Sequence, residues 1–179
     1  MRKFYLLFLL CVTGVVNAQD WTLKTTTDSM TDATTREAVL TLPTGESFAV
    51  MRRSDNSVWG YYRPATGQLF AAGDHLLVRV DKSKPVEFSD KFEQLSQRLG
   101  KKVEMWDWNP TLIATRIWHG NPSEGCGLIQ QLINGQQMVI RNHPNESTYR
   151  DVTFPLSGDK KALVEALDFD VANCPPPRS

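Results

Sequence analysis

The chain has 179 residues, with 20 basic and 20 acidic side chains, so its formal net charge is +0 at pH 7. Hydrophobic residues make up 41% and charged residues 22%, which is typical of a globular domain and excludes a disordered chain or a coiled coil. Balanced charge also argues against a basic surface for nucleic acid or for an anionic membrane. The length fits one domain.

The first 18 residues are typical of a secretory signal peptide. Arg2 and Lys3 precede an uncharged run over residues 4–16, and small residues surround Ala18. That run is too short to cross about 30 Å of hydrocarbon as a helix. We therefore expect cleavage after Ala18, export to the periplasm of a bacterium and no membrane insertion afterwards. Cys11 is expected to leave with the signal peptide, the alternative being a lipid-modified Cys11.

Cleavage leaves two cysteines, Cys126 and Cys174. In an oxidising compartment an even pair of cysteines is expected to form one disulfide, and the alternative is a reactive thiol. According to the chain-entropy model, a bridge that closes a loop of this length stabilises the fold by about 4 kcal/mol. It would secure the end of a single domain over residues 19–174, ahead of a proline-rich tail over residues 175–179.

Short stretches in which apolar and polar residues alternate cover most of the chain. Clusters of Pro, Gly, Asn and Asp separate them, which is typical of antiparallel strands joined by turns. The predicted strands are 38–42, 48–50, 59–61, 76–80, 103–108, 112–118, 138–140 and 152–156.

Three stretches instead have helical spacing, over residues 88–99, 128–133 and 163–167. Each is amphipathic and short, so each should pack on a sheet rather than stand alone. The prediction is an α+β fold: one domain with an antiparallel sheet, or meander, of about eight strands and two to three helices packed on it. Strands and helices do not alternate regularly, which excludes a doubly wound nucleotide-binding fold.

The sequence contains no motif of a known catalytic or nucleotide-binding site. His75, His119 and His143 lie far apart in the sequence and without partners at metal-ligand spacing, so we predict no metal site, no cofactor and no catalytic residue. Asp28 and Asp32 are four residues apart, and we expect them to form a turn between the first two strands rather than an acid–base pair.

Tryptophan provides the strongest candidate for a binding surface. Trp59 and Trp118 are expected in the core. For Trp106 and Trp108, the sequence is equally consistent with a buried and an exposed position. Tryptophan and arginine are enriched where proteins bind partners. The possible binding patch therefore comprises Trp106, Asp107, Trp108, Arg116 and Trp118.

Several short patterns resemble an uncharacterised family of exported bacterial proteins, which is distantly similar to the periplasmic accessory protein of type VI secretion. The stretches that carry the resemblance are Trp21–Lys24 with Asp28–Asp32, Val78–Asp81 with Lys84–Val86, Gly127–Leu132, Met138–Ile140, Val152–Gly158 and Ala162–Leu167. The resemblance implies a periplasmic accessory role and brings no catalytic residues.

We therefore expect a soluble, non-enzymatic periplasmic protein that binds a protein or an envelope glycan, with a link to a secretion system as one option. One alternative is an envelope hydrolase that uses carboxylates such as Asp28, Asp32 and Asp107. Another is an immunity or inhibitor protein that blocks a toxin with a protruding loop, such as 119–124 or 143–147.

Overall fold

The computed structural model describes residues 19–70, 76–87, 106–109, 111–120, 126–145 and 147–168. The predicted signal peptide, the predicted helix over residues 88–99, Cys174 and the proline-rich tail lie outside these residues.

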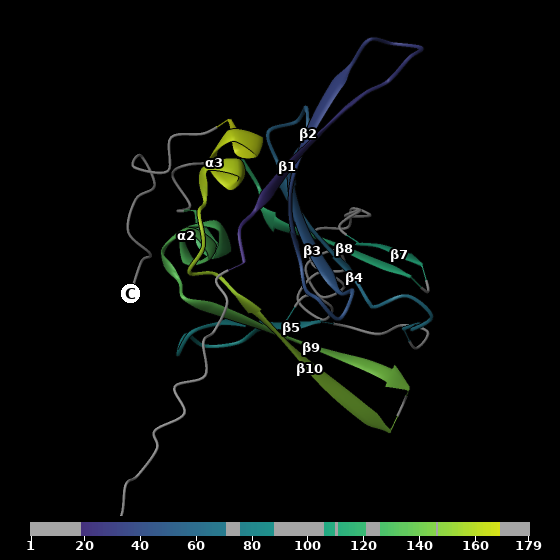
Figure 1. Ribbon diagram of the computed structural model, residues 1–179, viewed down its shortest axis with the longest axis vertical. Helices are drawn as coiled ribbons and strands as arrows, with labels where there is room; N and C mark the ends of the chain where they lie inside the picture. The colour runs from purple at the N-terminus through teal and green to yellow at the C-terminus, as the bar shows by residue number, and fades with distance from the viewer. Residues whose placement is uncertain are drawn as a thin grey trace, which may run out of the picture.

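The described strands form two antiparallel sheets, which confirms the predicted α+β class and the antiparallel pairing (Figure 1). The six-stranded sheet has the order β1-β2-β3-β4-β8-β7. Its strands are β1 (Thr22–Thr27), β2 (Thr34–Thr41), β3 (Ser47–Arg52), β4 (Val58–Arg63), β7 (Trp106–Asn109) and β8 (Leu112–Trp118). The four-stranded sheet has the order β10-β9-β5-β6. Its strands are β5 (Leu77–Val80), β6 (Val86–Glu87), β9 (Gln137–Asn145) and β10 (Thr148–Pro155).

Only the first part of the chain is the meander that the alternation predicted. Strands β1 to β4 pair with their neighbours in chain order, each across a short turn. The chain then leaves for the second sheet at β5, returns to the first with β7 and β8, and crosses again to β9 and β10. Alternation identifies a strand but not its partner, so a division into two sheets was not expected.

Two helices in the described part confirm two of the three predicted helical stretches. Helix α2 (Gly127–Asn134) contacts β8, and helix α3 (Lys161–Leu167) contacts β1, β2 and β3. Each helix buries an apolar face, formed by Leu128, Ile129 and Leu132 in α2 and by Leu163, Ala166 and Leu167 in α3. Both therefore lie on the six-stranded sheet, as their amphipathic spacing predicts.

Long basic side chains bind the last carbonyl groups of both helices. Nη1 of Arg52, on β3, donates hydrogen bonds to the carbonyl oxygens of Leu167 (3.2 Å) and Asp168 (2.7 Å) at the end of α3. Nζ of Lys160 donates to the carbonyl oxygens of Ile133, in the last turn of α2, and of Gly135, directly after the helix. A cation at a helix C-terminus satisfies carbonyl groups that have no partner within the helix and is favoured by the helix dipole.

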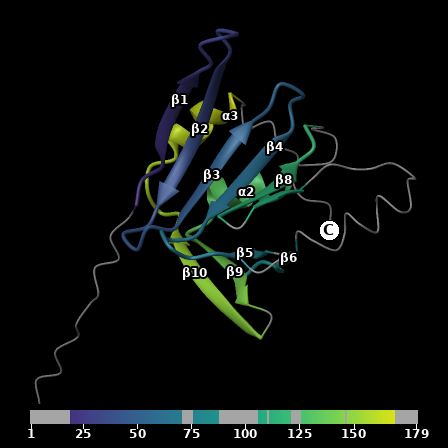
Figure 2. The same ribbon diagram turned by 90° about the vertical axis from the view of Figure 1, so that its right-hand side faces the viewer.

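Aromatic side chains join the two sheets. Phe154 on β10 packs against Phe48 on β3 and Tyr62 on β4, with both ring centroids 6.3 Å away. Beside them, Nδ2 of the buried Asn142 on β9 donates a 2.8 Å hydrogen bond to the hydroxyl oxygen of Tyr62. Seen from both directions, the second sheet closes one end of the molecule and the β1–β2 hairpin projects at the other (Figures 1 and 2).

The substitution Tyr62→Phe should lower the free energy of unfolding by about 1–3 kcal/mol, because it leaves the buried amide of Asn142 without its acceptor. Chemical denaturation monitored by circular dichroism measures this change. The control is Tyr149→Phe on β10, since the ring of Tyr149 is 61% exposed and its hydroxyl has no described hydrogen bond. Equal effects of the two substitutions would contradict the assigned role of the Tyr62 hydroxyl.

Candidate functional site

Of the predicted tryptophan patch, the structure describes the side chains of Arg116 and Trp118. Trp118 is 6% exposed and belongs to the core between the sheets. Arg116 lies opposite Trp59 of β4 in the strand register. Trp106 and Trp108 lie opposite Thr115 and Ile113, which are both buried, and their side chains are outside the described part, as is that of Asp107.

Trp59 is buried, as predicted, but arginines on the outer face of the six-stranded sheet provide much of its cover. The guanidinium carbon of Arg53 lies 3.8 Å from the ring centroid, and that of Arg116 lies 5.3 Å from it. The indole Nε1 donates a 3.0 Å hydrogen bond to Oγ of Ser57. Such stacking is a favourable cation–π arrangement, and it leaves little of this indole for a partner.

The β1–β2 hairpin carries a more exposed candidate surface at its tip, residues 28–33. Met30 is 90% exposed there. The carboxylate of Asp28 accepts hydrogen bonds from the backbone N–H groups of Met30 (2.7 Å) and Thr31 (3.1 Å). Asp32 has a positive φ of 55° and donates its own N–H to the carbonyl oxygen of Asp28. The expected turn is therefore confirmed, and it fixes the backbone that presents Met30.

The hydrogen bonds to the Asp28 carboxylate lower the pKa of this group, and the backbone N–H of Met30 is the largest cause. A lowered pKa favours the ionised form and is the opposite of what a general acid at neutral pH requires. Strand β7, which carries Asp107, lies at the other edge of the sheet from β1. Five strand spacings separate the two edges by roughly 24 Å. A carboxylate pair made from Asp28 and Asp107 is therefore not supported.

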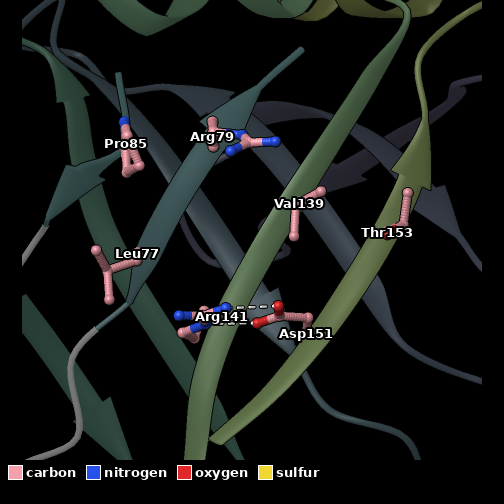
Figure 3. Close-up of a pocket in the computed structure, with 7 residues that line it drawn as sticks. All are labelled: Leu77, Arg79, Pro85, Val139, Arg141, Asp151 and Thr153. Atoms are coloured by element: carbon pink, nitrogen blue, oxygen red, sulfur yellow. Dashed lines mark hydrogen bonds and ion pairs between the residues drawn. The ribbon is translucent and has the colours of Figure 1, made fainter. Parts of the chain in front are cut away.

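A second candidate surface is a hollow of about 350 Å³ on the outer face of the four-stranded sheet (Figure 3). Its lining residues lie on three strands and the segment before β6; they are Leu77, Arg79, Pro85, Val139, Arg141, Asp151 and Thr153. The register forms two rows across the sheet. Arg79, Val139 and Thr153 lie in one row, and Leu77, Arg141 and Asp151 lie in the other. The alternation predicts that Val78, Val80 and Ile140 lie in the core. The residues next to them in the sequence are therefore expected on the opposite, outward-facing side of the sheet.

An ion pair crosses the floor of the hollow from β9 to β10. Nε and Nη2 of Arg141 donate hydrogen bonds of 2.6 and 2.8 Å to the two carboxylate oxygens of Asp151. This paired geometry lowers the pKa of Asp151 and raises that of Arg141. The ring of Tyr149 lies against the same guanidinium, 4.1 Å from its carbon atom.

The substitution Asp151→Asn should change the pH dependence of stability. The pKa of Asp151 in the folded protein lies below the ordinary value of 3.8, so the pair stabilises the fold above about pH 4 and ceases to do so as the pH falls through the lowered pKa. The melting-temperature difference between wild type and variant should therefore be largest near neutral pH and shrink towards pH 2. It will be small, because the carboxylate side chain is 40% exposed.

Thermal melts from pH 7 to pH 2 measure this difference. Asp32→Asn is the control, since no ion pair of Asp32 with another described residue is present. A difference for Asp151→Asn that stays constant across this range would contradict the assigned linkage.

Among the described residues, no group of His, Cys, Asp and Glu side chains is arranged to hold a metal ion. His119 and His143 lie at separate strand ends, and His75 lies outside the described part. Within the same residues, no helix is both long and apolar enough to cross a membrane.

Cys126 lies just before α2, where it is fully buried and disulfide-bonded. Its predicted partner, Cys174, is outside the described residues, so the pairing of these two cysteines stays a prediction.

Comparison with known proteins finds no matching family model, no matching curated protein and no matching solved structure. The relation to periplasmic accessory proteins therefore depends on the sequence patterns alone.

Sequence reasoning did not single out Met30 or the arginines of the hollow as candidate surface residues. Met30 was predicted to be part of a turn, but a turn motif in the sequence does not indicate how far the turn projects from the rest of the domain. Arg79 and Arg141 each occupy a polar position in an alternating strand, and such a position is exposed in any half-buried sheet. Only the pairing of β5 with β9 brings them to one face.

Proposed function

We propose that this protein is a soluble, non-enzymatic binding or accessory protein of the bacterial periplasm, and that it acts by inserting the tip of the β1–β2 hairpin into a partner protein. The observation that carries the proposal is the exposure of Met30 on a tip whose backbone is already fixed. At the end of a projecting hairpin, a flexible methionine side chain is free to enter an apolar pocket on a partner.

The hairpin is ordered for this role before it meets a partner. Its outer half is rich in threonine, whose β-branched side chain favours strands, and Thr27 pairs with Thr34 and Thr26 with Thr35 across the ribbon. Side chains on both faces of this half are exposed. A loop that is already ordered loses less conformational entropy on binding, which strengthens association.

The chemistry of the tip describes the partner surface that it fits. Asp28 and Asp32 flank Met30, and no basic residue occurs between Lys24 and Arg36. Methionine is flexible and adapts to irregular apolar pockets. We therefore expect an apolar pocket with a basic rim on the partner, since like charges around the pocket would oppose binding.

A periplasmic location rests on the signal-peptide pattern of the first 18 residues, and a link to a secretion system rests on the sequence resemblance. A toxin inhibitor is the second candidate, because a rigid projecting hairpin is also suited to block a cleft in an enzyme. This candidate uses the tip at residues 28–33 in place of the loops 119–124 and 143–147. Survival of cells that co-express this protein with a toxin encoded beside its gene would favour the inhibitor role over a general accessory role.

Photo-crosslinking in intact cells tests the proposed role of the tip. A benzophenone amino acid at position 30 should give one reproducible adduct, whose yield falls severalfold with Asp28→Ala because the tip loses its carboxylate acceptor. Asp28→Asn is the matched control, since its side-chain oxygen can still accept the two backbone hydrogen bonds. It should keep more of the adduct than Asp28→Ala, with a smaller loss that reflects the missing charge.

A benzophenone at position 164 controls for non-specific contact. Val164 on α3 is an exposed apolar residue, 40% accessible, on another element. The same adduct from positions 30 and 164, or no adduct from position 30, would contradict the proposed docking of the tip.

We further propose that Cys126 is bonded to Cys174. Cys126 is buried beside the helix that covers β8, so a bridge would hold the C-terminal end of the chain against the core. Peptide mapping of the exported protein without reduction should yield one linked peptide that contains both residues. A link from Cys126 to Cys11 would contradict both this pairing and the predicted removal of the signal peptide. Two free thiols under denaturing conditions would contradict the predicted disulfide.

A further inference from the structure

We propose that the hollow on the outer face of the four-stranded sheet binds a monoanionic carboxylate attached to a small apolar group. The site is separate from the hairpin tip, which lies at the other end of the molecule (Figures 1 and 2).

The first argument is the hydrogen-bonding capacity left in the hollow. The two hydrogen bonds to Asp151 use Nε and Nη2 of Arg141. No described residue accepts a hydrogen bond from Nη1 of Arg141. Arg79 forms no hydrogen bond or ion pair with any described residue, and its guanidinium extends toward β9 (Figure 3). Two arginines on one face thus retain donors, and arginine is the side chain best matched to a carboxylate.

The second argument is geometry. Arg79 lies opposite Val139 in the register, and Arg141 is two residues further along β9. The two arginines are therefore diagonal neighbours, about 7–8 Å apart at the backbone and within reach of one another through long side chains. Thr153 lies on the other side of Val139 and adds a hydroxyl donor. A single anion over Val139 can accept from Arg79 and from Thr153.

The third argument concerns the kind of anion. The described charges of the hollow are Arg79, Arg141 and Asp151, which sum to one positive charge. One negative charge balances this sum, whereas a phosphate dianion would exceed it. Leu77, Pro85 and Val139 provide apolar surface around the charged groups. A carboxylate with an aliphatic side group, as at the C-terminus of a peptide, fits both features.

Titration with N-acetyl-L-leucine tests the proposal, followed by nuclear magnetic resonance of the arginine Nε–H groups and of the backbone amides of Val139 and Thr153. We expect these signals to move and N-acetyl-L-leucinamide to bind at least tenfold more weakly, because the amide lacks the charge. Acetate, which lacks the aliphatic group, should bind severalfold more weakly than N-acetyl-L-leucine. Equal binding of the amide, or tighter binding of inorganic phosphate, would overturn the proposal.

Two matched variants locate the site. Arg79→Gln should weaken N-acetyl-L-leucine binding by about tenfold or more, as expected for loss of a charge-assisted hydrogen bond. Arg36→Gln, on the exposed part of the hairpin, should leave the affinity unchanged. Equal losses from both would show general charge attraction and overturn the proposal. Melting curves check that each variant is folded. If the Arg79→Gln variant still gives the same photo-crosslinked adduct from position 30, the hairpin functions independently of the hollow.

Discussion

The packing of Phe154 between the two sheets is the contact on which the rest of the structure depends. Its ring lies against Phe48 and Tyr62 of the first sheet, and the hydrogen bond from Asn142 to Tyr62 runs beside it. Burial of aromatic rings contributes a large share of core stability, and a buried hydrogen bond has strict geometry. Together they fix both the distance and the rotation of the second sheet against the first.

This junction determines which surfaces of the two sheets are left exposed. The helices and the second sheet cover one face of the six-stranded sheet, so the inner residues of β5, β9 and β10 join the same core. The alternate residues of these strands must then face outward, which places Arg79 and Arg141 on one face as diagonal neighbours. Arg150 on β10 reaches the buried carboxylate of Glu46 in the turn before β3. This ion pair adds a charged link between the sheets, at a site where loss of one partner would leave a buried charge.

Local patterns predicted the elements well and their assembly poorly. Alternation located strands such as β3, β4 and β8, and the spacing of Leu128, Ile129 and Leu132 located α2, because burial of one face sets the period of each element. Pairing depends on contacts between distant residues. Gly60 is an example: a Cβ atom there would lie 2.9 Å from the ring of Phe48, so the position of this buried ring favours a glycine that, in sequence, only weakens a strand. The tryptophan patch stays a prediction, and of its members the structure shows Trp118 to be buried, because the partner of each strand decides which residues are covered.

The hairpin and the hollow differ in what holds them, and this difference suits them to different kinds of partner. The base of the hairpin packs on α3, whose C-terminal carbonyl groups are bound by Arg52. Its tip is held by hydrogen bonds within residues 28–33, which include those accepted by the side chains of Asp28 and Thr31. The tip can therefore enter a concave surface without disturbing the core. The hollow is part of a four-stranded sheet whose inner face is buried, so it cannot deform to enclose a large partner. Its shape is suited to a small charged group or the end of a chain, while the projecting tip is suited to a folded protein.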